Sequence, residues 1–305
     1  MSEATAAFRR IIANVGRVIA GNDDAVEMAV ICLFADGNLL LEGVPGVGKT
    51  TLARALAVSI GGEFSRIQAW EQAEVGEVTG KTLLHLQCHF GLDTLSWARL
   101  GAAHVTGVDF SEPAIAFAKE LAAETGLADR ARFVVSNIYD LPGPLEGETF
   151  DVVYTGRGAL CWLPDLGPWA KAVASFLAPG GVFFIHEAHP VFWAVADEQT
   201  TPNDIHFGSD YWGRGGTQSF PVQGSYADLT AEVDAEVEHS WLHSLGEIVT
   251  LLANEGLRIE MLQEKRELGW PVPFLQPLPN GQHGFPPDQA GTWPLMYSLR
   301  ARKDG

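Results

Sequence analysis

The feature that most constrains the fold of this chain is the regular alternation of short apolar runs with helical runs after residue 80. Each apolar run has five or six residues, and nearly all of them are apolar, which is typical of strands buried on both faces of a parallel sheet. These predicted strands lie at residues 82–87, 104–109, 132–136, 150–155 and 182–186. The pattern predicts a doubly wound α/β domain.

The charge and the cysteine content of the chain limit which partners and which cellular compartment we expect. The chain has 20 Lys and Arg against 38 Asp and Glu, a net charge of −18, which disfavours nucleic acid and anionic membranes as partners. Its three cysteines are far apart and show neither a disulfide framework nor a zinc spacing. The sequence shows no apolar signal core and no 18-residue apolar run, so we expect a cytoplasmic protein with no membrane span.

The composition changes near residue 68. Residues 1–68 carry a net charge of −1, residues 69–305 carry −17, and all nine His and all nine Trp lie in the second part. We therefore expect two segments of different origin, 1–68 and 69–305. Within the second, residues 190–238 are an aromatic-rich insertion and a candidate lid, although the aromatics could equally pack the insertion onto the domain. Residues 269–294 are rich in Pro and Gly and predict a long surface loop.

The first segment contains a glycine-rich phosphate-binding pattern. The sequence GVPGVGKT at residues 43–50 follows a short apolar strand and precedes a helical run, the context that a P-loop requires. Its glycines let backbone N–H groups surround a phosphate, the lysine adds charge, and a threonine hydroxyl can bind Mg²⁺. The candidate phosphate-binding residues are Gly43, Gly46, Gly48, Lys49, Thr50 and Thr51.

Residues 8–68 as a whole resemble the start of MoxR-type ATPases of the AAA+ class, and the resemblance then stops. Hydrolysis in that class needs a later strand ending in paired acids, together with an arginine finger. No such strand follows in the sequence. The resemblance therefore implies a truncated P-loop α/β fragment that could bind ATP with Mg²⁺ but is not expected to hydrolyse it.

In the second segment, the carboxyl ends of the predicted strands mark the ligand site of a doubly wound sheet. The first strand leads into the loop 87–91, and the second strand ends at Asp109, 18 residues after Gly91. An acid at this place can accept hydrogen bonds from ribose hydroxyls. The loop lacks the GxGxxG pattern of dinucleotide-binding proteins, which argues against a nicotinamide-dependent oxidoreductase.

Residues 70–305 resemble class I S-adenosylmethionine-dependent methyltransferases. The resemblance rests on LLHLQCHFGLDTLSWARLGA, VTGVDFS, NIYDLP, FDVVYT with CWLPDL, and LAPGG, in that order. It implies a Rossmann-like sheet closed by a C-terminal antiparallel hairpin, with S-adenosylmethionine as the cofactor. Gln87 and His89 stand where this superfamily commonly has glycine, and only Gly91 is kept. By position, the resemblance implies these cofactor-binding residues: Gln87, His89, Phe90, Gly91, Asp109, Phe110, Asn137, Ile138, Thr155 and Gly156.

Methyl transfer needs a general base only if the acceptor must lose a proton. Glu187 and His189 follow the fifth strand and are the candidates for a base or an acceptor contact, although a structural role for each, or a metal site at the HxxH spacing, stays open. No metal is expected. The sequence thus predicts a methyltransferase for a small-molecule acceptor. The alternatives are a P-loop ATPase, or a fusion in which the first segment is an interaction element without catalysis.

Overall fold

The computed structural model describes residues 11–12, 26–30, 67–195, 200–201, 204–214, 216–221, 237–280, 282–287 and 291–305. Contacts within the chain divide it into two compact units, residues 1–65 with 220–238 and residues 66–219 with 239–305. In the first unit, residues 26–30 are helical, as the sequence indicates. The six candidate P-loop residues lie outside the described residues. The second unit carries the sheet and the candidate site.

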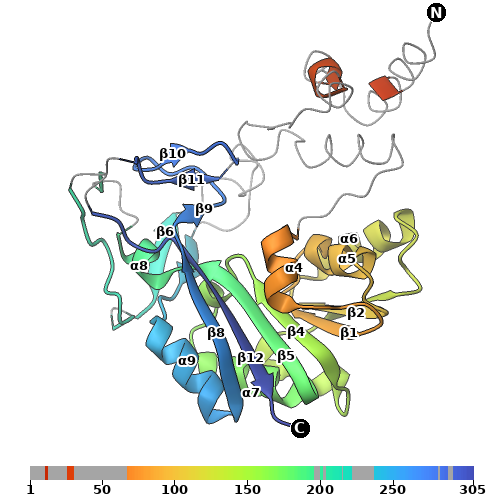
Figure 1. Cartoon of the computed structure of the whole chain (residues 1–305). Helices are drawn as coiled ribbons and strands as arrows, with labels where there is room; N and C mark the ends of the chain where they lie inside the picture. Colours follow the sequence, from red (N-terminus) through yellow and green to blue (C-terminus); the bar gives the residue numbers. More distant parts are fainter. Residues whose placement is uncertain are drawn as a thin grey trace, which may run out of the picture. The chain divides into compact units, whose positions relative to one another are not determined.

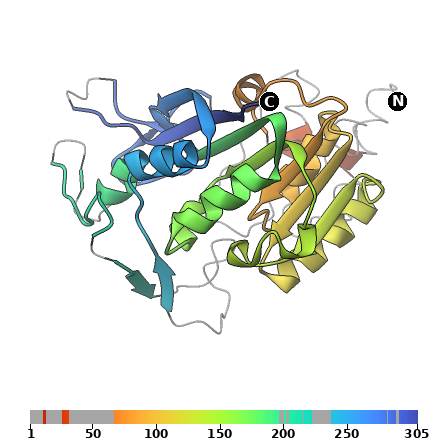
Figure 2. The ribbon, with the colours of Figure 1, turned by 90° about the horizontal axis from the view of Figure 1, so that it is seen from below.

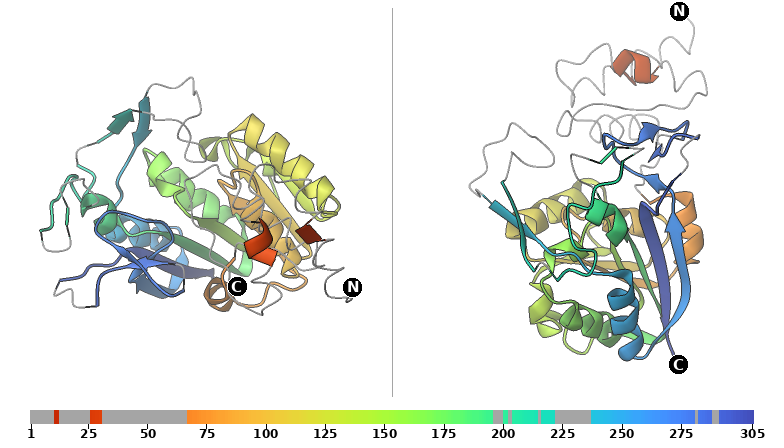
Figure 3. Two further views of the ribbon diagram at one scale, coloured as in Figure 1. Left: turned by 90° about the horizontal axis from the view of Figure 1, so that it is seen from above. Right: turned by 90° about the vertical axis from the view of Figure 1, so that its left-hand side faces the viewer.

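The second unit is built on a seven-stranded sheet with the order β3-β2-β1-β4-β5-β12-β8 (Figure 1). Neighbours among the first five strands pair in parallel, whereas β12 pairs antiparallel with both β5 and β8. This confirms the predicted Rossmann-like sheet with a C-terminal hairpin, which is seen as two long blue strands in Figure 3. The strands are β1 (Thr82–Leu86), β2 (His104–Asp109), β3 (Ala131–Val135), β4 (Phe150–Gly156), β5 (Leu177–Ala188), β8 (Leu257–Lys265) and β12 (Met296–Lys303).

Helices cover the sheet on both faces and enclose two hydrophobic clusters. On one face, α4 (Ala69–Val75), α5 (Leu92–Arg99) and α6 (Glu112–Glu124) bury a cluster that includes Trp97 and Phe133. On the other face, α7 (Leu166–Phe176) and α9 (Leu245–Asn254) lie side by side over a cluster that includes Trp169 (Figure 2). Apolar strands covered on both faces are what the alternating sequence pattern predicts.

Short polar side chains set where the helices begin. Ser111 accepts a hydrogen bond from Ala114 N and so caps the start of α6. The helix α7 begins three residues earlier than residue 169, where its apolar pattern becomes clear, because Asp165 accepts a hydrogen bond from Gly167 N. A residue that caps a helix lies outside the apolar pattern, so the pattern alone places the start too late.

The segment after residue 266 corrects a sequence expectation. Instead of a plain surface loop, it forms a small sheet in the order β10-β11-β9, with β9 at Glu267–Leu268, β10 at Gln276–Pro277 and β11 at His283–Gly284. Phe274 and Phe285 are buried and pack with Phe192 of α8 (Pro190–Val195) in a third hydrophobic cluster. The aromatic residues between the prolines therefore give this segment a core of its own.

A second small sheet pairs β6 (Gln218–Pro221) with β7 (Val237–Ser240). In the described part of the chain, no helix has the length and apolar character needed to cross a membrane.

Gly91 offers a test of how tightly the loop after β1 is packed. A Cβ added there would lie 2.6 Å from Cε1 of Phe133 and 2.9 Å from Cβ of Ala118, and the backbone is left-handed, with φ of 71°. We expect Gly91→Ala to lower the free energy of unfolding by about 2–5 kcal/mol, from backbone strain and overpacking together.

The matched control is Gly126→Ala. Gly126 has φ of 68°, and an added Cβ would meet no atom within 4 Å. The free energy of unfolding of Gly126→Ala should therefore fall only by the cost of backbone strain, about 1–2 kcal/mol. Denaturant unfolding compares the two variants, and equal losses would contradict the packing argument.

Candidate functional site

The loop between β1 and α5 has few glycines, but its backbone adopts conformations that are usual for glycine. Gln87, His89 and Gly91 all have positive φ values, 58°, 49° and 71°. Left-handed backbone costs a non-glycine residue about 1–2 kcal/mol, so the loop stores strain at two positions. The sequence departs from the common glycine pattern at these positions, whereas the backbone conformation that glycine favours is retained.

Asp109, the last residue of β2, holds this loop in place. Its Oδ2 accepts a hydrogen bond of 2.8 Å from His89 N, and its Oδ1 accepts one of 2.9 Å from Ser111 N. The carboxylate is buried, and Cys88 N donates to Val108 O beside it. Asp109 therefore joins the end of β1 to the start of α6.

The other residues implied for the adenosine side line the ends of β2 and β3. Phe110 exposes 70% of its surface directly after Asp109. Asn137 follows β3, and its Oδ1 accepts a hydrogen bond from Tyr139 N at the start of the 3-10 helix η1 (Ile138–Asp140). Ile138 is buried in the hydrophobic core and offers the site only packing.

At the carboxyl ends of β1 and β4, two polar groups of the site lack hydrogen-bond partners among the described residues. They are the Thr155 hydroxyl, which is fully buried, and Oε1 of Gln87. The other end of the Gln87 amide, Nε2, donates to Ala159 O at 2.8 Å. Gly156 ends β4 beside His186 of β5, and an added Cβ there would lie 3.2 Å from His186 O.

Glu187 holds the turn that follows β4. Its Oε2 accepts a 2.7 Å hydrogen bond from Gly158 N, and its Oε1 accepts bonds of 2.6 Å from Ala159 N and 3.4 Å from Leu160 N. Burial raises the pKa of Glu187 to about 7, although these backbone N–H groups oppose the rise. The carboxylate thus shapes a turn, and it also lines a cleft.

His189 lies apart from this turn. Its Nδ1 accepts a hydrogen bond from Val191 N, and its Nε2 is 3.1 Å from Oε1 of Glu264 on β8. Burial lowers the pKa of His189, and Glu264 opposes the fall. The two candidates for a base are therefore near in sequence but have separate partners.

A buried charged cluster at the ends of β4 and α5 was not predicted from the sequence. Arg157, with φ of 66°, donates a 2.5 Å hydrogen bond to the fully buried Glu71 of α4, and its Nε lies 3.5 Å from Asp93 of α5. Tyr154 also donates to Glu71. Burial raises the pKa of Glu71, and the Arg157 guanidinium opposes that rise. Glu71 and Arg157 are 86 residues apart, so only the position of Arg157 at a strand end could have drawn attention to it.

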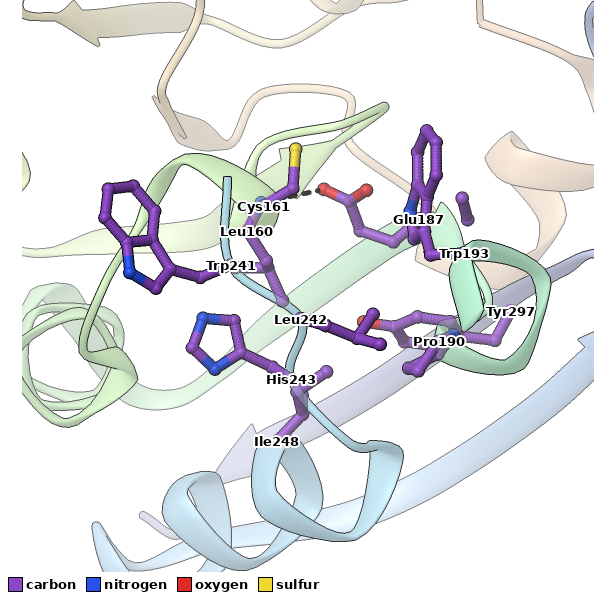
Figure 4. Close-up of a pocket in the computed structure, with 11 residues that line it drawn as sticks. Leu160, Cys161, Glu187, Pro190, Trp193, Trp241, Leu242, His243, Ile248 and Tyr297 are labelled. Carbon is purple, nitrogen blue, oxygen red and sulfur yellow. Dashed lines mark hydrogen bonds between the residues drawn. The ribbon is translucent and has the colours of Figure 1, made fainter. Parts of the chain in front are cut away.

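A cleft opens beside Glu187, on the face of the sheet that carries α9 (Figure 4). Its empty volume, including the open mouth, is about 300 Å³. Most of its wall is apolar or aromatic, and its polar side chains come from Cys161, Glu187, His243 and Tyr297. The remaining lining residues are Leu160, Ala188, Pro190, Trp193, Trp241, Leu242 and Ile248. Within the described residues, no group of three or more His, Cys, Asp or Glu side chains is arranged to hold a metal ion.

Two family models match the chain. Residues 83–181 match a family described as "Methyltransferase domain", and residues 38–92 match "ATPase family associated with various cellular activities (AAA)". The two matches overlap at residues 83–92, which in the structure form most of β1, the site loop and the start of α5. These ten residues therefore belong to the seven-stranded sheet and to the loop and helix that follow its strand β1.

Known proteins fall into the same two groups. A structure described as a putative S-adenosylmethionine-dependent methyltransferase, from Listeria monocytogenes, is 22% identical with a TM-score of 0.56, covering 77% of this chain and 96% of that chain. This likeness shows the fold. "Methyltransferase phqN" of Penicillium fellutanum is 28% identical over 127 residues, which are 42% of this chain and 36% of the relative. "Chaperone MoxR1" of Mycobacterium tuberculosis is 49% identical over 61 residues, 20% of this chain and 16% of the relative. This chain spans less than a quarter of the length of the first curated relatives it matches, which are "Uncharacterized protein YeaC", "Protein MoxR" and "Chaperone MoxR1".

The strain in the site loop can be tested at His89, whose side chain is exposed. We expect His89→Gly to raise the free energy of unfolding by about 0.5–1 kcal/mol, because glycine adopts positive φ without steric cost. His89→Val should lower it by about 1–2 kcal/mol, because a β-branched residue tolerates this conformation poorly. Urea unfolding of the two variants checks the order, and a more stable valine variant would refute the strain.

The buried Glu187 carboxyl should make stability depend on pH. Its pKa is about 7 in the folded protein against an ordinary 4.5, so the folded state binds a proton that the unfolded chain has released. This group favours folding fully below pH 4.5, and its contribution of about 3 kcal/mol is lost as the pH rises to about 7.

The Glu187→Gln variant lacks this titration, so the stability difference between wild type and variant should narrow or reverse as the pH rises through this window. Thermal unfolding at a series of pH values measures the difference. The exposed Glu255→Gln serves as the control and should follow wild type throughout. A difference between wild type and Glu187→Gln that stays constant from pH 4.5 to 7 would show that Glu187 titrates normally.

Proposed function

We propose that this chain, which carries a methyltransferase domain preceded by a segment similar to MoxR-type ATPases, transfers a methyl group from S-adenosylmethionine to a small-molecule acceptor. The observation that carries the proposal is the strained loop of residues 87–91 held against Asp109, where the parallel strands β1 and β2 end. This is the crevice in which doubly wound sheets bind their ligands. When bound, S-adenosylmethionine supplies a methyl group already activated on a sulfonium.

The residues at this crevice fit the adenosine part of the cofactor. Each carboxylate oxygen of Asp109 accepts one backbone hydrogen bond and keeps a lone pair for a ribose hydroxyl. The exposed ring of Phe110 offers a face to adenine. Oδ1 of Asn137 also keeps a lone pair beyond its bond to Tyr139 N, enough to accept from an adenine amino group.

The methionine part of the cofactor would lie toward the ends of β1 and β4. Oε1 of Gln87 and the Thr155 hydroxyl have no hydrogen-bond partners among the described residues, which suits polar groups that await a ligand. Arg157 lies at the same end of β4 and exposes 27% of its side chain. Its guanidinium can contact a carboxylate, while Glu71 and Asp93 around it favour an ammonium.

The acceptor would occupy the cleft beside Glu187. Proximity and orientation account for most of what the protein must supply, because the cofactor carries the reactive group. The cleft is lined mostly by apolar and aromatic side chains with a few polar groups, a lining typical of small-molecule sites. The net charge of −18 also disfavours nucleic acid and anionic membranes as partners.

Nucleotide binding by the N-terminal segment is a second candidate function. The pattern at residues 43–50 and the match to the AAA family at residues 38–92 favour it. Lys49 and Thr50 would hold ATP and Mg²⁺ there. An interaction role for this segment remains the alternative if ATP does not bind.

Asp109 provides the main test of the proposed function. We expect saturable binding of S-adenosylhomocysteine to the full chain by calorimetry, and about a 10- to 100-fold weaker affinity in Asp109→Ala. The variant loses the ribose contact and also the bond that fixes His89 N.

The control is Asp129→Ala, an exposed acid between α6 and β3, which should keep the wild-type affinity. In the same series, ATP is titrated into the wild-type chain and into Lys49→Ala. Binding of ATP and binding of S-adenosylhomocysteine are thus measured independently. If S-adenosylhomocysteine does not bind the wild-type chain at all, the methyltransferase proposal fails.

A further inference from the structure

We propose that the cleft beside Glu187 binds a compact amine as the methyl acceptor, with the ammonium group paired to the Glu187 carboxylate. This inference rests on the proposed function for the identity of the reaction, and on the cleft for the chemistry of its ligand.

Glu187 is a buried carboxylate without a cationic partner. Its hydrogen bonds come from backbone N–H groups of residues 158–160 and of Ala188, and no described Lys, Arg or His side chain pairs with it. A buried carboxylate is costly unless it is paired. A ligand ammonium would supply the missing counter-charge, whereas a carboxylate or phosphate ligand would be repelled.

Tyr297 offers a second polar group in the same cleft. It lies directly across from Glu187 in the antiparallel pairing of β12 with β5, so the two side chains share one face of the sheet. Tyr297 is 1% exposed, and its hydroxyl has no hydrogen-bond partner among the described residues. Figure 4 shows this hydroxyl pointing into the cleft toward Leu242. An unpaired buried hydroxyl is costly, and a polar group of a ligand in the cleft would satisfy it.

The walls of the cleft suit a cation with an apolar body. Trp193 and Trp241 both line it, and Trp193 stacks on Trp270 with 6.5 Å between ring centroids. Aromatic faces attract ammonium groups, most strongly where water is excluded. His243 is not available to contact the ligand nitrogen, because its Nε2 lies 2.7 Å from Leu163 O and its Nδ1 lies 3.3 Å from Glu247 Oε2.

The cleft is connected directly to the cofactor loop. The turn of residues 158–160 is held by Glu187 on the cleft side and by Gln87 Nε2, which donates to Ala159 O, on the loop side. One short turn therefore separates the proposed acceptor site from the residues proposed to hold the cofactor. A nitrogen beside Glu187 would therefore lie near the residues proposed to hold the cofactor.

Glu187 also supplies a place for the proton that an amine must lose. An ammonium ligand transfers one proton to the carboxylate: the N–H bond breaks, its electron pair stays on nitrogen as the lone pair that attacks, and an O–H bond forms on Glu187. Neither an oxidant nor a further reactant is needed.

The test uses three probes of one shape on the full chain in the presence of S-adenosylhomocysteine. Benzylamine is cationic, benzyl alcohol is neutral and benzoate is anionic. We expect the affinity for benzylamine to be at least about tenfold higher than that for benzyl alcohol, and the affinity for benzoate to be the lowest of the three. Calorimetry and tryptophan fluorescence measure these affinities. Glu187→Gln should reduce the preference for the amine to about threefold or less, and Tyr297→Phe should weaken benzylamine binding about three- to tenfold.

Glu255→Gln is the control and should keep the wild-type preference. If Glu187→Gln does not fold, the wild-type probe series and Tyr297→Phe decide the question alone. Equal affinities for benzylamine and benzyl alcohol, or a preference for benzoate, would overturn the amine site even if S-adenosylhomocysteine binds. An amine preference without any binding of S-adenosylhomocysteine would support the amine site and remove the proposed methyl transfer, so the two failures are distinguishable.

Discussion

The hydrogen bond from His89 N to the Asp109 carboxylate is the interaction on which the rest of the site depends. Loops at the carboxyl ends of parallel strands have no sheet partner, so their backbone N–H groups need another acceptor. Asp109 supplies one to the loop after β1 and a second to Ser111 N at the start of α6. By joining two strand ends through one buried carboxylate, it compensates for the strain that left-handed Gln87 and His89 introduce.

The turn after β4 is organised by the same principle. Residues 158–160 aim three N–H groups at Glu187, as residues 89 and 111 aim theirs at Asp109. The surroundings of the two carboxylates differ. Glu187 is enclosed deeply enough for burial to raise its pKa to about 7. A carboxyl that can change its charge near neutral pH can hold a turn and still exchange a proton.

The sheet was predictable because its strands are continuously apolar and regularly spaced. The bounds of β2, His104–Asp109, agree with the strand predicted at residues 104–109. The start of α7 and the small sheet after residue 266 were less predictable, because a capping Asp165 and scattered aromatics carry no periodic signal. Within the site, the positions of Asp109 and Glu187 at the ends of predicted strands identified them as candidates. The spacing of residues in the sequence could not show which backbone N–H groups donate to them.

The least predictable contacts join residues far apart in the sequence. Tyr297 and Glu187 are 110 positions apart and meet only because β12 runs antiparallel to β5 and enters the sheet beside it. In a parallel sheet the strand ends gather at one edge, whereas an antiparallel neighbour brings the start of its own strand to that edge. The C-terminal hairpin thus places the amino end of β12 beside the carboxyl end of β5. That topology puts the buried Tyr297 beside Glu187, the residue that shapes the β4 turn, so the hairpin that closes the sheet also builds one wall of the cleft.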